Sequence, residues 1–273
     1  MAGSTPLITC MTISQAPRLR HLAHAIHDFC AQTWARKELL IVLDDPEYSR
    51  EVHKLIERID GEIYVLDCAD RASLGKLRNF ALEHANGELV CQWDDDDRYS
   101  PERLQLQATV LLEDGASACF LYQQLHFFES TRQLFWTDWR LCYGRQTIQA
   151  PDCWVPGTVL FCRGSARYPE QGNLSVRGED SVLAFALWND GAIAIETPPG
   201  TYVRIFHGNN TWSQEHHLAL AQCRSQNVGT VFAWRSRLED VTRKFGLDSP
   251  VSLMAGAEIA YQIQGSSELH KQS

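Results

Sequence analysis

Residues 89–101 constrain the fold more than any other stretch, because a short apolar run ends there in four consecutive aspartates. The run Leu89–Trp93 predicts a buried strand, and Ser100-Pro101 is a typical helix start, with serine as N-cap and proline in the first turn. Four like charges at one strand end repel one another unless something neutralises them. Mg²⁺ or Mn²⁺ does this with one or two protein carboxylates and phosphate oxygens from a substrate. The pattern therefore favours a metal site, and a solvated acidic turn is the alternative.

Short apolar runs alternate with segments of helical spacing throughout the first 115 residues. The predicted strands lie at residues 7–12, 39–43, 63–66 and 89–93, and the predicted helices at 18–32, 47–59, 73–84 and 101–112. This alternation with short connections indicates a parallel sheet with helices on both faces. Such sheets bind ligands beyond the carboxyl ends of their strands. Thr12, Asp44-Asp45 and the aspartates Asp94–Asp97 all fall at such ends, so three strand ends point to one site.

The pattern changes after Gly115 and becomes rich in aromatic strands. We predict strands at 118–128, 133–143, 159–162, 193–195 and 202–205, a hairpin turn at 129–132 and a helix at 180–187. From Ser213 onward the spacing is helical and the composition more polar. No internal repeat or low-complexity linker interrupts the chain, so we expect one domain with a helical tail.

Charge and cysteine content exclude several classes of partner. The net charge of −9 argues against nucleic acid and against a polybasic membrane surface. The nine cysteines are odd in number and form no C-x-x-C pair, which favours reduced thiols in a cytosol. The N-terminus lacks a basic region followed by a long apolar run, and no window reaches about 18 apolar residues. We therefore expect no signal peptide, no transmembrane segment, and a cytoplasmic protein for which peripheral association with the inner face of the membrane stays open.

Four segments carry a resemblance to a known family. They are Pro6–Asp45 with Ala31-Gln32-Thr33-Trp34, Leu74–Ala81 followed by Ala85–Glu88, the pattern Asp94-x-Asp96-Asp97 with Pro101, and Gly178-Glu179-Asp180 at a helix start. In this order and spacing they resemble the family-2 glycosyltransferases of the GT-A fold, over about residues 6–212. The resemblance implies an α/β fold with a Rossmann-like, mixed but mainly parallel sheet flanked by helices, and a C-terminal helical tail.

The same resemblance implies a division of the chain and a reaction. Residues 1–212 would form the GT-A domain, with a nucleotide-binding half at 1–115 and an acceptor-side half at 116–212, and residues 213–273 a helical extension packed on that domain. The implied reaction moves a sugar from a nucleotide diphosphate-sugar to the hydroxyl of a glycan, lipid-linked or other acceptor, with inversion. A UDP-sugar is the default donor of the family, Mn²⁺ or Mg²⁺ the implied cofactor, and glycan or polysaccharide assembly the implied setting.

The resemblance also assigns roles to individual residues. Asp180 is the expected base that takes the acceptor proton, and Glu179 is the neighbouring candidate. Asp96, Asp97 and His207 are the expected metal ligands, and the metal would offset the charge of the leaving diphosphate. The residues expected to bind the nucleotide are Thr12, Asp44, Asp45, Arg78, Asp94 and Asp95.

Most of these residues also have a structural explanation. Glu179 and Asp180 suit a helix N-terminus simply as anions. Arg78 can form a surface ion pair, Asp44 can cap the next helix, and His207 can be an ordinary loop histidine. Aromatic residues of the second half are either core or a platform for sugar rings. The members of this group are Trp136, Trp139, Tyr143 and Trp154.

Two other functions compete with glycosyl transfer. A nucleotidyltransferase shares the sheet and the acidic site, but it usually needs a glycine-rich phosphate loop after the first strand, and residues 12–17 contain no glycine. A nucleotide- or carbohydrate-binding protein without turnover is the second rival. A buried salt bridge at Asp180 would favour that rival, because a base must be accessible to its substrate. A glycoside hydrolase would need two opposed carboxylates and no metal, so the aspartates at the strand end argue against that function.

Overall fold

The computed structural model describes residues 5–15, 18–43, 45–68, 72–141, 150–247 and 250–264. These residues divide into two compact units, and each is considered by itself. Unit 1 consists of the described residues within 1–121 and 149–195, and unit 2 of those within 122–148 and 196–273. The boundary predicted at residue 212 falls inside unit 2.

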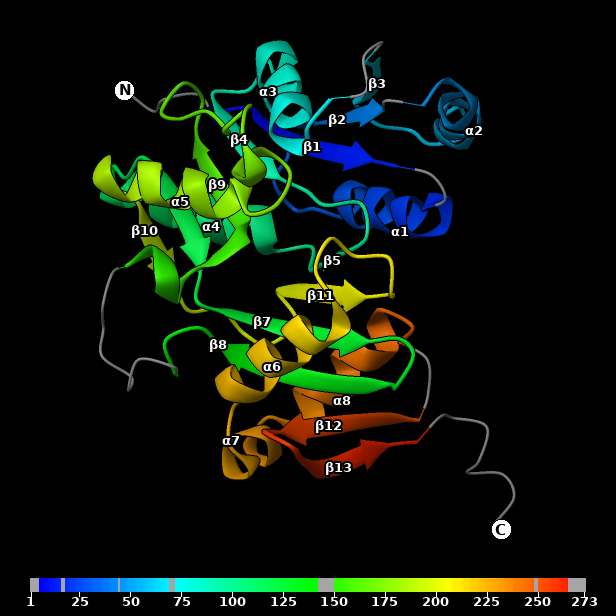
Figure 1. The fold of residues 1–273 in the computed structure, drawn as a ribbon, viewed down its shortest axis with the longest axis vertical. Coiled ribbons are helices and arrows are strands. Elements are labelled where there is room, and N and C mark those ends of the chain that lie inside the picture. Colours follow the sequence, from blue (N-terminus) through cyan, green and yellow to red (C-terminus); the bar gives the residue numbers. More distant parts are fainter. Residues whose placement is uncertain are drawn as a thin grey trace. The chain divides into compact units, whose positions relative to one another are not determined.

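Unit 1 is built on one mixed sheet (Figure 1). Its strands are β1 (Ile8–Ser14), β2 (Lys37–Leu43), β3 (Ile63–Asp67), β4 (Leu89–Gln92), β6 (Ala118–Leu121), β9 (Val155–Cys162) and β10 (Ile193–Ile195). Their order is β10-β6-β9-β4-β1-β2-β3. β1 pairs in parallel with β2 and β4, β2 pairs in parallel with β3, and β9 runs antiparallel between β4 and β6. The predicted mixed, mainly parallel sheet is confirmed.

Helices follow the strands of unit 1 in the predicted order. They are α1 (Leu19–Cys30), α2 (Pro46–Ile56), α3 (Leu74–His84), α4 (Arg103–Asp114) and α5 (Glu179–Asn189), with short 3₁₀ turns η2 (Pro151–Cys153) and η3 (Asn173–Ser175). A further short strand, β5 (Arg98–Tyr99), lies between β4 and α4. α3 packs on β1 and β2, α2 on β3, and α4 on β6 and β9. The alternation predicted over the first 115 residues is confirmed, with modest shifts at the element ends.

The strands of unit 1 are buried along their length. Every residue of β1 and β4 is buried, and so are six of the seven residues of β2. Continuous burial is expected of parallel strands covered on both faces, and it explains apolar runs without alternation. Cys10 and Cys91 contribute to this core as small apolar side chains.

A buried polar network fixes the amino-terminal side of the same sheet. Glu38 of β2 accepts hydrogen bonds from Thr9 Oγ1 at 2.5 Å, from the Asn86 N–H at 2.8 Å and from Asn86 Nδ2 at 3.0 Å. The N–H of Gly87 donates to Thr9 Oγ1 at 2.8 Å. A Cβ on Gly87 would lie 2.7 Å from three backbone atoms, so only glycine fits there. The Asn86-Gly87 segment therefore positions β4, which leads directly into the aspartates.

Unit 2 contains a second sheet. Its strands are β7 (Gln123–Phe128), β8 (Gln133–Asp138), β11 (Tyr202–Phe206), β12 (Val251–Ala255) and β13 (Glu258–Ile263), in the order β13-β12-β8-β7-β11. β7 and β8 form the predicted antiparallel hairpin. The segment predicted as one strand at 118–128 forms two strands. The β conformation is interrupted at Tyr122, and β6 and β7 belong to different sheets.

The C-terminal region is only partly helical. The helical spacing predicted from Ser213 onward corresponds to α6 (Gln214–Arg224), α7 (Val228–Ala233) and α8 (Arg235–Lys244), and the strands β12 and β13, which were not predicted, follow them. β12 is held between β8 and β13, where Val251 and Leu253 are fully buried. This pairing with a distant strand decides the conformation, which the local sequence did not indicate. No helix of the described residues combines the length and apolar character needed to cross a membrane.

Candidate active site

The carboxyl ends of three strands meet at one edge of the unit 1 sheet. β1 and β4 are parallel with Cys10 opposite Cys91, and β1 and β2 are parallel with Ser14 opposite Leu43. The segments that follow β1, β2 and β4 therefore leave the sheet at the same edge, as the sequence predicted.

The four residues Asp94–Asp97, called the aspartate turn below, follow β4. Within this turn Asp95 is almost completely buried. It accepts hydrogen bonds from Ser14 Oγ at 2.6 Å and from Arg18 Nη1 at 3.1 Å. Burial and the charge of Asp96 raise the pKa of Asp95 to about 7, although Arg18 and Ser14 oppose the shift. The same Arg18 nitrogen lies 3.4 Å from Asp96, whose side chain is 13% exposed. Asp95 thus anchors the turn, whereas Asp96 reaches the surface.

Asp94 is oriented by two donors. Arg78 Nη2 lies 2.9 Å from its Oδ1, and Gln92 Nε2 lies 3.0 Å from its Oδ2. The Tyr99 hydroxyl donates to the Asp94 carbonyl at 2.9 Å. The Asp94 side chain is 24% exposed, so it can still accept a hydrogen bond from a ligand.

Arg78 connects this turn to a distant helix. Its Nε donates to Glu179 Oε1 at 3.1 Å, and its guanidinium lies 5.5 Å from the centre of the Tyr168 ring. Arg78 is 5% exposed, and its Nη1 has no hydrogen-bond partner among the described residues. Burial raises the pKa of Glu179 to about 7, with Arg78 opposing the shift and Asp180 adding to it. The guanidinium therefore offsets only part of the cost of burying this carboxyl group.

The motif around Arg78 explains its position. A Cβ on Gly75 would lie 1.9 Å from the Pro169 carbonyl oxygen, so the backbone of 168–170 passes directly over α3. Asn79 clamps that segment, since its Nδ2 donates to the Tyr168 carbonyl at 2.9 Å and its Oδ1 accepts from the Tyr168 N–H at 3.0 Å. Gly75 and Asn79 therefore hold Tyr168 beside Arg78.

Glu179 and Asp180 have different surroundings although they are adjacent. Glu179 is 4% exposed and ion-paired to Arg78, whereas Asp180 is half-buried and accepts a hydrogen bond from the Ser181 N–H at 2.8 Å. Among the described residues, Asp180 forms no ion pair. Neighbouring helical residues point about 100° apart, so one of them faces inward and the other does not. Asp180 keeps the accessible carboxylate.

The other predicted nucleotide-binding residues have structural contacts. Thr12 is fully buried and its hydroxyl donates to the Trp93 carbonyl at 2.7 Å. Asp45 is the N-cap of α2, and its Oδ1 accepts from the Glu47 N–H at 2.9 Å. Asp44 lies outside the described residues. Thr12 and Asp45 therefore have defined structural roles, and their contact with a nucleotide stays a prediction.

The two remaining predicted metal ligands are Asp97 and His207. Asp97 is 3% exposed. His207 follows β11 in unit 2, where its N–H donates to Asn210 Oδ1 at 2.9 Å. Unit 1 thus brings Asp94, Asp95 and Asp96 together with Arg78, while the role of His207 stays a prediction.

Sequence reasoning did not identify Ser14, Arg18, Gln92 or Tyr168. Tyr168 donates its hydroxyl hydrogen to Gln92 Oε1 at 3.2 Å, and Gln92 in turn orients Asp94. Arg18 was detectable as a cation that follows the end of β1. Nothing local marks Tyr168, because its role arises from the path of 168–170 over α3.

The aromatic residues proposed as a sugar platform divide into different environments. Trp154 is fully buried and stacks on Phe120 at 4.8 Å, so it belongs to the core. The Arg224 guanidinium lies 3.8 Å from the centre of the Trp139 ring. Tyr143 lies outside the described residues. Trp136 lines a cavity, which is described below.

Sequence comparison relates the chain to sugar-transferring enzymes. A sequence model described as glycosyl transferase family 2 matches residues 18–170. TuaG of Bacillus subtilis, named for teichuronic acid biosynthesis, is 27% identical over 121 residues, which is 44% of this chain and 48% of that protein. The Escherichia coli UDP-Glc:alpha-D-GlcNAc-diphosphoundecaprenol beta-1,3-glucosyltransferase WfgD is 30% identical over 101 residues, which is 37% of this chain and 39% of that protein. The matches span about half or less of these relatives.

Structural comparison identifies the fold. TarS 1-349 of S. aureus, in complex with UDP-GlcNAc, has a TM-score of 0.57 at 13% identity and covers 88% of this chain and 65% of that one. The mannosyltransferase PcManGT from Pyrobaculum calidifontis, in complex with GDP-Man and Mn²⁺, has a TM-score of 0.57 at 18% identity and covers 90% of this chain and 66% of that one. The fold is of the GT-A type.

Proposed function

The chain belongs to glycosyl transferase family 2, and we propose that it transfers a sugar from a nucleotide diphosphate-sugar to an acceptor hydroxyl with inversion. The observation that carries the proposal is the buried Arg78, which joins Asp94 of the aspartate turn to Glu179. The arginine thereby fixes the donor side of the site relative to Asp180. A nucleotide-binding protein without turnover has no need to hold an accessible carboxylate, Asp180, next to the ion-paired Glu179.

The donor is held at the strand ends of unit 1. Asp94, already oriented by Arg78 and Gln92, accepts a hydrogen bond from the nucleotide. Asp45 caps α2 through Oδ1 only and keeps Oδ2 for the base or ribose. Thr12 and Asp95 act by shaping the turn, since both are buried and engaged with protein groups. Uridine is the proposed base, in line with the UDP-sugar named for WfgD.

The proposed divalent ion lies at Asp96, a partly buried carboxylate of this turn. No group of three metal-ligating side chains occurs in the part of the chain that is described, so the ion would have few protein ligands and would take the rest from diphosphate and water. Asp96 suits this role because its side chain is 13% exposed, whereas Asp95 is 1% exposed; Arg18 lies 3.4 Å from Asp96 and also pairs with Asp95. Asp97 is the second carboxylate of the set. Bound Mn²⁺ or Mg²⁺ offsets the charge that develops on the leaving diphosphate.

Asp180 acts as the general base. Its carboxylate takes the proton of the acceptor hydroxyl while that oxygen attacks the anomeric carbon, and the bond to the diphosphate breaks with its electron pair. Glu179 is a positioning residue, because its ion pair with Arg78 fixes the first turn of α5 and with it the direction of Asp180. The nucleoside diphosphate is the second product.

The acceptor is proposed to be a glycan under assembly. WfgD is named for a diphosphoundecaprenol-linked acceptor and TuaG for teichuronic acid biosynthesis. A lipid-linked saccharide or another hydroxyl acceptor of polysaccharide assembly therefore suits this chain. We propose that the reaction takes place in the cytoplasm, at the inner face of the membrane.

Calorimetric titration with nucleoside diphosphates, with and without Mn²⁺, tests the proposal. We expect one nucleotide to bind only with Mn²⁺ present, and Asp96→Ala to abolish that binding. Asp114→Ala, at an exposed aspartate at the end of α4, is the matched control and should bind as the wild type does. Unchanged affinity in Asp96→Ala would rule out its metal role, and no nucleotide binding to the folded wild type would reject the donor site. Release of pyrophosphate instead of nucleoside diphosphate during turnover would identify a nucleotidyltransferase.

A further inference from the structure

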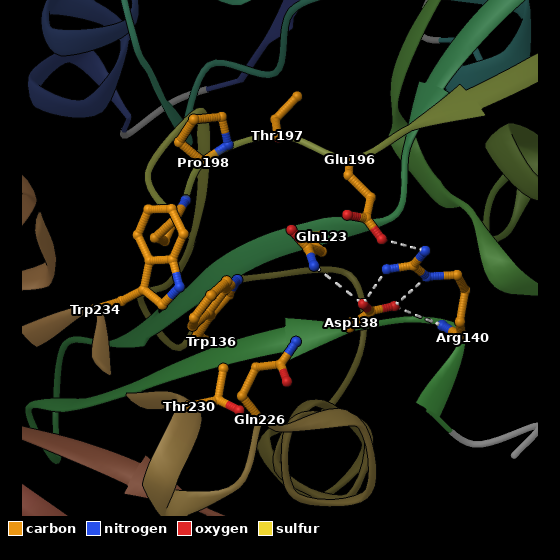
Figure 2. Close-up of a pocket in the computed structure, with 11 residues that line it drawn as sticks. Gln123, Trp136, Asp138, Arg140, Glu196, Thr197, Pro198, Gln226, Thr230 and Trp234 are labelled. Atoms are coloured by element: carbon orange, nitrogen blue, oxygen red, sulfur yellow. Dashed lines mark hydrogen bonds and ion pairs between the residues drawn. The ribbon is translucent and has the colours of Figure 1, made fainter. Parts of the chain in front are cut away.

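Unit 2 contains a cavity that the proposed reaction does not use. Its volume is about 590 Å³, within the range of ligand-binding pockets. Its walls come from β7, β8, residues 196–199 and residues 226–234 (Figure 2). No residue assigned above to donor, metal or base lines it.

Two tryptophans form the aromatic wall. Trp136 of β8 is 4% exposed, and Trp234, between α7 and α8, is 42% exposed. Their ring centres lie 5.8 Å apart at an angle of 70°, so the two rings form a corner and not a stack (Figure 2). Part of the Trp234 ring is therefore accessible, while Trp136 closes the floor of the cavity.

A network of charged and amide groups forms the opposite wall. Arg140 Nη2 lies 2.5 Å from Asp138 Oδ2, and Arg140 Nη1 lies 2.5 Å from Glu196 Oε1. Gln123 Nε2 donates to Asp138 Oδ2 at 3.0 Å. Two carboxylates face one guanidinium, and that guanidinium is already engaged by both. The wall is therefore net negative and offers acceptor oxygens, which disfavours an anionic ligand.

Two polar groups at the cavity lack protein partners. Gln226 is 5% exposed, its backbone N–H donates to the Trp136 carbonyl at 2.8 Å, and its side-chain amide forms no hydrogen bond with the described residues. Figure 2 shows this carboxamide directed into the cavity. Trp136 Nε1 is buried and also has no partner among those residues. The Gln226 amide can therefore pair with a ligand in the cavity, and the buried indole N–H of Trp136 beside it is an unsatisfied donor.

The cavity walls are held in place without a ligand. Thr201 N–H and Oγ1 both donate to the Pro198 carbonyl, at 3.2 and 2.9 Å. Arg237 Nε of α8 donates to the Pro199 carbonyl at 3.3 Å. Gly200 has a φ of +92°, and a Cβ there would lie 2.4 Å from Val241 Cγ2, so the turn is packed against α8. A preformed site loses less free energy on binding than a flexible one.

This set of groups matches one kind of ligand. A tryptophan face suits the C–H face of a pyranose ring, and carboxylate and amide groups suit its hydroxyls. The net negative wall disfavours uronic acids and phosphates. We propose that the cavity binds a neutral pyranose unit of a glycan, through Trp234, Gln226 and Glu196. This binding goes beyond the proposed transfer, because it requires neither nucleotide nor metal.

Saccharide binding to the full chain tests the proposal in the absence of nucleotide and metal. The probes are the neutral disaccharides cellobiose and N,N′-diacetylchitobiose, with methyl glucuronide as the acidic probe, followed by calorimetry and by saturation-transfer NMR. We expect at least one neutral disaccharide to bind and the glucuronide to bind more weakly. Trp234→Ala should weaken binding at least about tenfold. Trp188→Ala, at an equally exposed tryptophan of unit 1, should leave it unchanged.

A second variant separates ligand binding from a structural role. Gln226→Met replaces the unpartnered amide with an apolar chain of similar length, so thermal stability should stay equal or rise while saccharide affinity falls several-fold. Asp96→Ala should bind saccharide as the wild type does, so the proposal can fail or hold independently of the donor site. No binding of either neutral disaccharide, unchanged binding in Trp234→Ala, or tighter binding of the glucuronide would overturn it.

Discussion

Arg78 of unit 1 and Arg140 of unit 2 each bridge a pair of carboxylates, and the surroundings of these two triads differ. Arg78 is 5% exposed and joins Asp94 to Glu179, which belong to segments far apart in the sequence. Removal of any one of these three side chains would leave an uncompensated charge on a buried or partly buried partner. This triad therefore ties the aspartate turn to the start of α5.

The second triad is partly solvated. Arg140 pairs with Asp138, two residues earlier, and with Glu196, whose side chain is 64% exposed. Water screens that contact and lowers what it contributes. An arginine between two carboxylates thus has different consequences in the two places. The buried Arg78 triad holds two distant segments together, whereas the more open Arg140 triad forms the wall of a cavity.

The largest expected effect concerns the residue that the Arg78 triad positions. Asp180→Asn removes the proton acceptor and should lower kcat by about 10²–10⁴-fold with unchanged nucleotide affinity. Glu179→Gln keeps an oxygen for Arg78 and should cost less. Transfer rates at saturating donor, together with calorimetry of the nucleotide, measure both. Near-normal turnover in Asp180→Asn would reject it as the base, and a larger loss in Glu179→Gln would move that role to Glu179.

Removal of the arginines compares the triads directly. Arg78→Ala leaves Glu179 and Asp94 without their counter-ion and should lower the free energy of unfolding by about 3–5 kcal/mol. Arg140→Ala should cost about 1–2 kcal/mol, because Glu196 is 64% exposed and the buried Asp138 keeps its hydrogen bond from Gln123. Urea denaturation of both variants gives the values. Equal losses would show that burial does not separate the two triads.

The pH dependence of stability should have opposite signs in the two triads. Burial raises the pKa of Glu179 from 4.5 to about 7, so its stabilising contribution is present below pH 4.5 and declines as the pH rises to 7. Burial alone would also raise the pKa of Asp138, but hydrogen bonds from Arg140 and Gln123 outweigh it and lower that pKa below 3.8. Its contribution is present above pH 3.8 and is lost as the pH falls further.

Urea denaturation across this pH range checks those signs. Relative to Glu179→Gln, the wild type should lose stability between pH 4.5 and 7. Relative to Asp138→Asn, the wild type should lose stability as the pH falls below 3.8. Parallel curves for the wild type and either variant would contradict the corresponding shift.

The smallest expected effect is at the exposed end of the second triad. Glu196→Gln removes one charge from a side chain that is 64% exposed, so the free energy of unfolding should fall by at most about 1 kcal/mol. The urea midpoint measures it, with Arg78→Ala as the reference for a buried triad. A loss as large as that of Arg78→Ala would mean that Glu196 is an internal support and not part of an open wall.

The sequence by itself determined the order of strands and helices over the first 115 residues. Apolar runs, helical spacing and the breaks between them are local signals, and elements that depend on local signals form where they are predicted. The placement of Asp94–Asp97 at a strand end follows in the same way. Four short motifs in order were enough to indicate the family.

The tertiary structure decided which of the carboxylates are buried and which partners they have. Asp95 is buried because Ser14 and Arg18 meet it at the sheet edge, and Glu179 pairs with Arg78 across 101 residues of sequence. The strands β12 and β13 form because β8 offers them an edge. The burial of a side chain and its ion pairs depend on which distant segments come together, and the local spacing of residues does not indicate this. The cavity beside Trp136 and Trp234 has the same origin, since its lining residues become neighbours only when unit 2 folds.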